Sequence, residues 1–508
     1  MKYPLSLILA IAMAPLLQAA DSSGFCNVRT FGAVGDGKTL DSPAINKAIE
    51  TTAAAGGGTI VVPAGTYLCG SIHLKSNIHL IIDAGATILG APQELNAYDE
   101  TEPWSYNPYQ DGGHCYFHNS LIWGENLTNV SITGQGVING GGLTHADFIL
   151  DKMCGYIYWQ KKIAPPAGEV LPPLRLGNKA IALKLCRNVL IRDVTIAHGG
   201  HFAILVTGCN NLTIDNVTID TDRDGMDIDC CINTTVSNCR VNSPRDDGIC
   251  PKSSFALGHN VITENLTITN CQVSGFQEGS LLDGTMKPSP QHNGRIKFGT
   301  EASGGFRNCT VSNCTFRSCK GLALEEVDGG LLENITIDNL AMTDVMNYAI
   351  YITTGTRNRG GDVEHPSILR NILISNVIAD HVGKQSGIQI MGIPGHPLEN
   401  IRLDNIRLIS DGGGAIQPTA PPELGAGYPE PRGVMPAYAI YARHVRGLEL
   451  ANIDTGFDTP DPRPAASFSD INGLEIDNFK PQLAQGASAA VMSQDVTGVV
   501  IRNSPSLH

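Results

Sequence analysis

From residue 188 onward, short stretches of alternating apolar and polar residues recur along the chain. Each copy begins with an asparagine, continues with β-branched or leucine residues at every second position, and ends near a second Asn or Asp. This alternation has the period of a β-strand. The copies begin at Asn188, Asn211, Asn233, Asn265, Asn308, Asn334, Asn371 and Asn400. One such strand cannot bury its apolar side alone, so the copies must stack, which predicts an all-β solenoid of parallel strands.

The asparagine at the corner of each copy has a physical reason. Asn adopts the left-handed αL conformation more readily than most residues, and its side chain hydrogen-bonds its neighbours. We therefore expect the asparagines to form ladders from coil to coil. The intervals between copies vary, which indicates loops inserted between constant strands.

The N-terminal part has a different pattern. Residues 41–55 have helical spacing, with Asp41 or Ser42 as a possible N-cap, and strands are expected at 59–62 and 78–82. We expect the helix to cover the open end of the solenoid. Residues 91–119 and 412–436 are predicted surface loops that rim a groove. No boundary of a second domain is apparent, so residues 21–508 form one predicted β-helix domain.

Charge and the N-terminal residues narrow the functional class. The net charge is −14, which disfavours a nucleic-acid partner and requires a local basic patch for any acidic polysaccharide. Residues 1–20 have the composition of a secretory signal peptide, with an apolar run too short for a membrane span. We expect a periplasmic or extracellular monomer without a membrane partner.

The 14 cysteines are compatible with disulfides or with buried thiols in the repeats. No Cys-x-x-Cys pair occurs, so we predict no metal site and no cofactor.

Carboxylates gather where one repeat follows the next. Asp224 lies in a run that also contains Asp220, Asp222, Asp227 and Asp229. Asp246 and Asp247 follow one repeat later, because Asp246 is as far from Asp224 as Asn233 is from Asn211. We expect these carboxylates to face outward on adjacent coils, with Gly225 as a bulge that keeps Asp227 outward.

This cluster permits several interpretations. Like charges raise at least one carboxyl pKa, and glycoside hydrolysis needs one acid beside one or two bases. The alternatives are that Asp and Gly form the turns of the solenoid, or that the carboxylates bind Ca²⁺.

The chain resembles glycoside hydrolase family 28, the polygalacturonase-like, pectin-degrading enzymes. Asp222-Arg-Asp-Gly-Met-Asp227 is similar to the family's Asn-Thr-Asp-Gly-Ile-Asp segment, and Asp246-Asp247 to its Gly-Asp-Asp element. Residues 31–37, 56–63 and 134–140 also resemble segments found in this family and its relatives. The resemblance implies a right-handed parallel β-helix in which Asp246 is the general acid and Asp224 and Asp247 activate water. It also implies inversion, with an acid–base separation of about 6.5–9.5 Å.

The chain departs from the family at the substrate-binding motifs. Gly294 stands where the family has its Gly-His-Gly histidine, and His292 is a substitute candidate. Arg295 and Lys297 match the basic substrate-binding motif of the family, but they occur one coil before the place where that motif is expected. They either clamp a substrate carboxylate or form a solvated pair around buried Ile296. The remaining substrate-binding candidates are Glu301, Glu325 and Phe202, with Glu326, Arg357, Arg359, Trp104, Tyr106 and Tyr109 as weaker ones.

We therefore predict a secreted glycoside hydrolase that cleaves pectic polysaccharide, exo-acting or directed at rhamnogalacturonan. A polysaccharide lyase on the same fold and a non-catalytic carbohydrate-binding solenoid are the alternatives.

Overall fold

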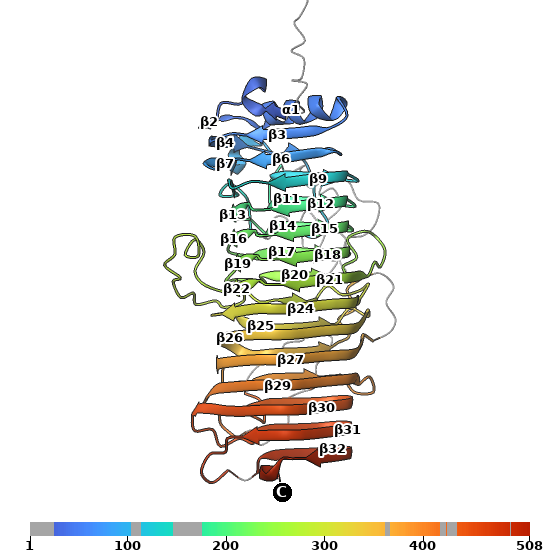
Figure 1. Ribbon diagram of the computed structural model, residues 1–508. Coiled ribbons are helices and arrows are strands. Elements are labelled where there is room, and N and C mark those ends of the chain that lie inside the picture. Colours follow the sequence, from blue (N-terminus) through green and yellow to red (C-terminus); the bar gives the residue numbers. More distant parts are fainter. Residues whose placement is uncertain are drawn as a thin grey trace, which may run out of the picture.

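The computed structural model describes residues 25–102, 113–145, 175–360, 366–416, 423, 434–487 and 489–507. The chain winds into coils that stack from α1 (Ser42–Ala54) at one end to β32 (Val491–Arg502) at the other (Figure 1). Strands of each coil pair in parallel with strands of the next coil. The predicted parallel solenoid is therefore confirmed.

The strands form three stacks around the coil, named here the first, second and third stack. The first stack contains β1 (Phe25–Asn27), β3 (Gly58–Val62), β6 (Ile78–Ile82), β9 (Thr128–Thr133), β12 (Arg187–Arg192), β15 (Asn210–Asp215), β18 (Ile232–Ser237) and β21 (Thr263–Thr269). The second contains β2 (Asp36–Leu40), β4 (Gly65–Cys69), β7 (Ala86–Gly90), β10 (Val137–Asn139), β13 (Thr195–Ala197), β16 (Thr218–Asp220), β19 (Arg240–Asn242) and β22 (Gln272–Ser274).

The third stack carries the candidate site. It contains β5 (Ile72–His73), β8 (Ile122–Glu125), β11 (Lys179–Lys184), β14 (Phe202–Thr207), β17 (Asp224–Asp229), β20 (Ile249–Lys252), β23 (Lys297–Phe298), β25 (Lys320–Glu326) and β28 (Ile388–Met391). Towards the C-terminus, longer strands bend around the corners and join the stacks. These are β24 (Phe306–Arg317), β26 (Leu331–Thr354), β27 (Ile368–Val382), β29 (Leu398–Gly412), β30 (Ile440–Thr459), β31 (Ala466–Pro481) and β32.

Apolar side chains stack in register inside the coils. In the third stack Met226 pairs with Ile204 on one coil and Ile249 on the next, and all three are fully buried. Burying each such side chain contributes about 1.5–3 kcal/mol. Because side chains alternate along a strand, this inward ladder turns the residues between them outward.

Asparagine ladders stabilise the corners, as predicted. Asn371 has a φ of 58°, donates its side-chain N–H to Asn334 Oδ1 at 3.2 Å and accepts from Asn400 at 3.0 Å. A second ladder contains Asn405, which donates to Asn376 Oδ1 at 2.7 Å. The amides thus connect exposed corners that no apolar contact could hold.

The N-terminal helix α1 lies over the first coils and spans Ser42–Ala54, within one residue of the prediction. Asp41 occupies the N-cap position, as predicted, but its side chain makes no capping hydrogen bond to the helix. The Asp41 carboxylate accepts instead from the backbone N–H of Val34 at 2.7 Å and of Gly35 at 2.9 Å. Ser42 Oγ accepts from Gly70 N at 3.2 Å. Both side chains therefore tie the helix to neighbouring turns. Short 3₁₀ helices are η1 (Val28–Phe31), η2 (Gln93–Leu95) and η3 (Pro505–Leu507).

The predicted surface loop at 91–119 is partly wrong. Tyr98 and Phe117 are fully buried, because this segment packs against the coils. Residues 103–112, with Trp104, Tyr106 and Tyr109, lie outside the described residues, as do the predicted signal peptide and most of 417–433. Within the described ranges, every helix is too short or too polar to cross a bilayer. The 13 described cysteines are buried free thiols, so the buried-thiol interpretation is confirmed for them.

We predict that Asn371→Ala destabilises the protein by about 1–3 kcal/mol, because alanine strains the αL backbone and breaks two side-chain bonds. Asn371→Gly, which keeps the positive φ, should lose less. Urea unfolding midpoints of both variants measure the difference. Equal midpoints for the two would contradict the αL argument.

Candidate active site

Coil stacking brings the predicted carboxylates together in the third stack. Asp224 begins β17, and Asp246 and Asp247 lie directly before β20. Gly225 N donates to Asp247 O at 2.9 Å, and Met226 pairs with Ile249. Asp247 therefore lies opposite Asp224, whereas the repeat interval predicted Asp246 in that position. The shift of one position arises because the turn before β20 is one residue longer than in the preceding repeat. The carboxylates of Asp224, Asp246 and Asp247 each offer an oxygen within 4.8 Å of the others.

Asp246 is the carboxylate of this group that solvent reaches. Its side chain is 29% exposed and lies 2.8 Å from Arg223 Nη2. The other Asp246 oxygen accepts from Asp247 N at 3.1 Å. Asp246 lines a cavity of about 410 Å³ whose other walls are Arg223, Arg245, Gln291, His292 and Asn293. A bound molecule in this cavity would therefore meet Asp246 directly.

Asp247 is buried between two basic side chains. Its Oδ1 lies 2.9 Å from Arg295 Nε, and its Oδ2 contacts Lys297 Nζ. Burial acts to raise the pKa of Asp247, but the positive charges of Lys297 and Arg295 outweigh it and lower the pKa below its ordinary value. Arg295 also lies 3.1 Å from Glu325 Oε1. Asp247 is therefore a fixed carboxylate that accepts hydrogen bonds.

Asp224 has the opposite electrostatic environment. Burial is the largest cause that raises the pKa of Asp224 well above its ordinary value, and the negative charges of Asp246 and Asp227 raise it further. Arg223 Nη2 is 3.9 Å away, too far for a close ion pair. The environments of Asp224 and Asp247 thus push the pKa values of two neighbouring carboxyl groups apart.

Arg295 and Lys297 face the same side of their strand, as their spacing predicts. Both are buried, so the interpretation as a solvated pair is wrong. In this structure their charged groups bind Asp247, and Glu325 is a second partner of Arg295. They serve here as counterions of a protein carboxylate.

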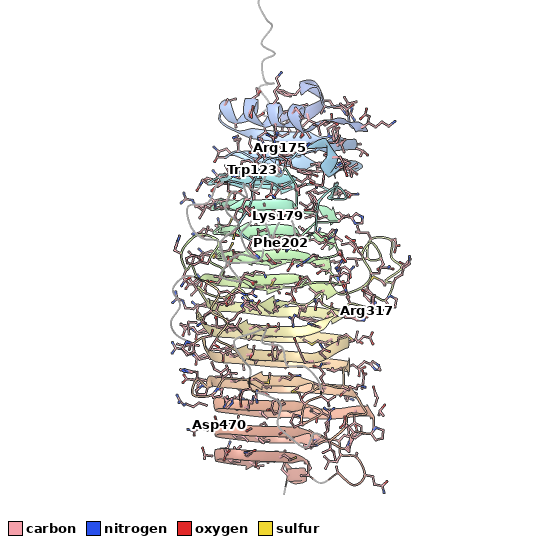
Figure 2. All side chains as sticks on the ribbon, turned by 180° about the vertical axis from the view of Figure 1, so that it is seen from behind. Trp123, Arg175, Lys179, Phe202, Arg317 and Asp470 are labelled. Carbon is pink, nitrogen blue, oxygen red and sulfur yellow. The ribbon has the colours of Figure 1, made fainter. Side chains whose placement is uncertain are left out.

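Of the other substrate-binding candidates, some are buried in the protein and one lines the cavity. Glu301 is buried, lies 2.7 Å from Lys252 Nζ and 3.2 Å from Arg357 Nη2, and so holds two buried cations. Phe202 is fully buried and stacks on His201, with ring centroids 4.1 Å apart. Figure 2 shows Phe202 one coil below Lys179, its partner in register. His292 lines the cavity, and its role in substrate binding stays a prediction.

Two charged residues near the cluster, His114 and Lys252, were not identified from the sequence. His114 Nε2 lies 2.9 Å from Asp227 Oδ2, and Lys252 Nζ lies 3.5 Å from the same carboxylate. Burial disfavours the charged Lys252, but surrounding negative groups, led by Asp227, raise its pKa. No local motif identifies His114, because it is far from Asp227 along the chain.

Two further aspartates of the run, Asp220 and Asp229, accept hydrogen bonds from neighbouring segments. Asp220 accepts from the backbone N–H groups of Gly279, Leu281 and Leu282, each at 3.0 Å. Asp229 accepts from Ser254 N at 2.8 Å and Ser254 Oγ at 2.7 Å. Both side chains are buried, because the segments they bind cover them.

Known proteins with this architecture carry names related to pectin breakdown. Residues 25–250 match the family model "Rhamnogalacturonase A/epimerase, pectate lyase-like", and residues 179–359 match "Right handed beta helix region". A probable polygalacturonase of Vitis vinifera is 25% identical over 398 residues, covering 74% of this chain and 73% of the relative. An exo-poly-alpha-D-galacturonosidase of Dickeya chrysanthemi is 24% identical and covers 72% of this chain and 64% of the relative.

Solved structures give the same architecture. The exopolygalacturonase of Thermotoga maritima superposes with a TM-score of 0.62 at 24% identity, over 76% of this chain and 87% of that one. The family 28 exopolygalacturonase of Yersinia enterocolitica has a TM-score of 0.62 at 19% identity, over 90% and 77%. These similarities support a polygalacturonase-like glycoside hydrolase of family 28. Its parallel β-helix is right-handed, as the resemblance implied.

The nearest oxygens of the three carboxylates lie within 4.8 Å of one another, whereas the separation of about 6.5–9.5 Å implied for inversion is measured between whole carboxyl groups. Arg223 Nη2 lies 2.8 Å from Asp246 Oδ2 and 3.9 Å from Asp224 Oδ2. The separation alone therefore does not decide the stereochemical outcome.

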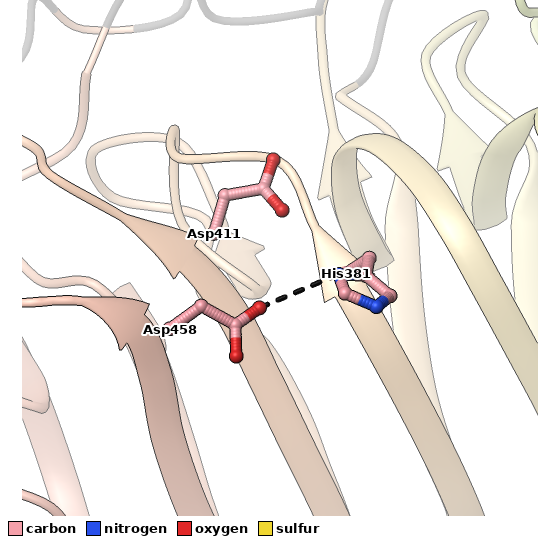
Figure 3. A group of neighbouring side chains, drawn as sticks. All are labelled: His381, Asp411 and Asp458. Atoms are coloured by element: carbon pink, nitrogen blue, oxygen red, sulfur yellow. Dashed lines mark ion pairs between the residues drawn. The ribbon is translucent and has the colours of Figure 1, made fainter.

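Two groups of described side chains have the spacing of metal ligands. One is the Asp224–Asp246–Asp247 cluster, where adjacent Arg223, Arg295 and Lys297 already supply positive charge that opposes a cation. The other is the exposed group His381, Asp411 and Asp458 (Figure 3), in which His381 Nδ1 lies 3.3 Å from Asp458 Oδ2. The first group fits acid–base chemistry better than Ca²⁺ binding.

We predict that Asp247→Asn destabilises the protein by about 3–5 kcal/mol, because it leaves the buried charges of Arg295 and Lys297 uncompensated. The lowered pKa makes ionised Asp247 stabilising above about pH 4, and this contribution is lost as the pH falls through the lowered value. Urea unfolding at pH 7 measures the loss. An unchanged midpoint would contradict the buried ion pairs.

Asp224→Asn should have the opposite effect and stabilise the protein. The raised pKa means that ionised Asp224 costs stability above about pH 4, and the neutral amide removes that cost. The variant should unfold at higher urea concentration than wild type at pH 7, and the two should converge as the pH falls towards 4. A variant less stable than wild type at pH 7 would contradict the assigned environment.

Proposed function

We propose that the protein hydrolyses pectic polysaccharide at uronate-containing glycosidic bonds, with the Asp224–Asp246–Asp247 cluster as the catalytic group. The observation that carries this proposal is the division of three adjacent carboxyl groups into three environments. One is open to a cavity, one is buried with a raised pKa, and one is buried with a lowered pKa. Such division is the usual basis for assigning acid and base roles.

Asp246 is the general acid in this proposal. It is the member of the cluster that lines the cavity, so the glycosidic oxygen of a bound chain can come within hydrogen-bond reach. Its proton passes to the leaving oxygen as the bond between that oxygen and the anomeric carbon breaks.

Asp224 and Asp247 hold and deprotonate the attacking water. Both oxygens of Asp247 already contact basic groups, which makes this carboxylate a poor nucleophile and favours water as the attacking group. Attack by water in one displacement inverts the anomeric configuration. The raised pKa of Asp224 makes it the stronger base of the two when it is ionised.

The names of the relatives support a more specific substrate and mode of action. Names of relatives and neighbours include exopolygalacturonase and exo-poly-alpha-D-galacturonosidase, which supports release of short products from a chain end. The family-model description includes rhamnogalacturonase, which keeps rhamnogalacturonan as a second candidate substrate. The composition of residues 1–20 supports action outside the cytoplasm.

The test measures new reducing ends and ultraviolet absorbance of unsaturated uronate together, on polygalacturonate, rhamnogalacturonan and a neutral galactan. We expect reducing ends from a uronate polymer without absorbance, and a loss of about 10²–10⁴-fold for Asp246→Asn. Proton NMR of the first product should show the inverted anomer, and early digests should contain one short product.

Asp380→Asn is the matched control, because Asp380 is an exposed carboxylate on β27, remote from the cavity, and should retain full activity. Absorbance that rises only with Ca²⁺ would make the protein a lyase. Binding without cleavage, unchanged in Asp246→Asn, would make it a carbohydrate-binding solenoid. A ladder of many product lengths would refute exo action.

A further inference from the structure

The cavity beside Asp246 contains basic side chains that the family motifs do not account for. A chain of net charge −14 needs local positive charge to bind an acidic sugar. Arg295 and Lys297 are buried against Asp247 and do not line this cavity. Two other cations, Arg223 and Arg245, do.

Arg223 joins the cavity to the candidate general acid. It directly precedes Asp224, and its Nη2 lies 2.8 Å from Asp246 Oδ2 with the side chain 24% exposed. A guanidinium carries five N–H donors in a fixed fork, so it can contact one carboxylate and present further donors to another. Arg223 and Asp246 line the same cavity, so a sugar bound there can contact both side chains.

Arg245 supplies the second charge from the next coil. Its side chain is 55% exposed, and Nη1 lies 3.0 Å from Asp222 Oδ2. The backbone of Arg245 is held on both sides, because its N–H donates to Asp222 O at 3.0 Å and its carbonyl accepts from Asn293 Nδ2 at 2.7 Å. The arginine is thus fixed at its base and open to solvent at its charged end.

The cavity has a size and polarity that suit a sugar carboxylate. Its volume of about 410 Å³ is at the lower end of small-ligand sites, which measure about 300–1,000 Å³. The remaining walls, Gln291, His292 and Asn293, are polar side chains suited to sugar hydroxyls. Two guanidinium groups favour a carboxylate over a neutral hydroxymethyl group, because charge-assisted bonds are the stronger ones.

We propose that Arg223 and Arg245 bind the carboxylate of the uronate on the leaving-group side of the scissile bond. This inference rests on the proposed function and names the residues that select an acidic sugar beside Asp246. The arginine pair takes the place of Arg295 and Lys297, whose charges hold Asp247. The site therefore selects a free carboxylate and discriminates against its methyl ester.

The experiment compares oligogalacturonate with its fully methyl-esterified form, which keeps the sugar and removes the charge. The quantity measured is the ratio of kcat/KM on the free acid to kcat/KM on the ester. We expect wild type to prefer the free acid. Arg245→Gln and Arg223→Gln should each lower the ratio by about 10- to 100-fold, the value of a hydrogen bond to a charged group.

The two variants differ in what else they disturb. Arg223→Gln also removes the partner of Asp246, so its kcat should fall together with its preference. Arg245 is mostly exposed, so Arg245→Gln should fold normally and lose affinity for the free acid, seen as a higher KM with little change in kcat. Arg402→Gln is the control, because Arg402 is an exposed arginine paired with Glu449 at 2.7 Å outside the cavity, and its ratio should match wild type.

The outcomes separate this inference from the proposed function. Wild-type cleavage with an unchanged ratio in both arginine variants would overturn the inference and leave the proposed function standing. A wild type that cleaves neither substrate would overturn both. A reduced ratio in Arg245→Gln with a wild-type unfolding midpoint would establish the arginine subsite.

Discussion

The parallel register between coils is the constraint on which the rest of the structure depends. Each strand lies about 4.8 Å from its neighbour, so each side chain lies directly against the equivalent side chain of the next coil. Apolar residues therefore stack inside, as Ile204, Met226 and Ile249 do. Corner asparagines form ladders for the same reason. Charged residues on the outer side face the same requirement and need a partner one coil away.

That requirement explains the electrostatics of the site. Asp247 is balanced by Arg295 and Lys297 of the following coil, and Lys252 lies between Asp227 and Glu301. These pairs permit charged groups to be buried, and they lower the pKa of Asp247 and raise the pKa of Lys252 against the effect of burial. Asp246 lies at the edge of this network, where solvent and the cavity reach it. In the proposed mechanism Asp246 is the acid because it lines the cavity.

Local pattern predicts the repeating parts of the molecule well. The Asn-based repeat predicted the parallel solenoid and its ladders, because strand period and corner conformation are local properties. The helical spacing predicted α1 to within one residue. The proximity of Asp224, Asp246 and Asp247 followed from repeat length plus family motif, although the register differs by one residue where the turn before β20 is longer.

The errors of sequence analysis concern contacts between distant segments. The burial of Arg295 and Lys297 depends on which coil carries Asp247, and no local spacing encodes it. His114 reaches Asp227 from a segment predicted as a surface loop. Tyr98 and Phe117 are buried for the same reason, since that segment returns to the coils and packs on them. Such contacts follow from the path of an insertion, which apolar periodicity does not describe.

A crystal structure of the Asp246→Asn protein with a bound oligogalacturonate would test the central claim most directly. Binding as proposed places a glycosidic oxygen beside residue 246 and a uronate carboxylate on Arg223 and Arg245, with Arg295 and Lys297 still bound to Asp247. A substrate carboxylate on Arg295 and Lys297, with their contacts to Asp247 broken, would contradict it. So would an oligosaccharide bound away from the three carboxylates.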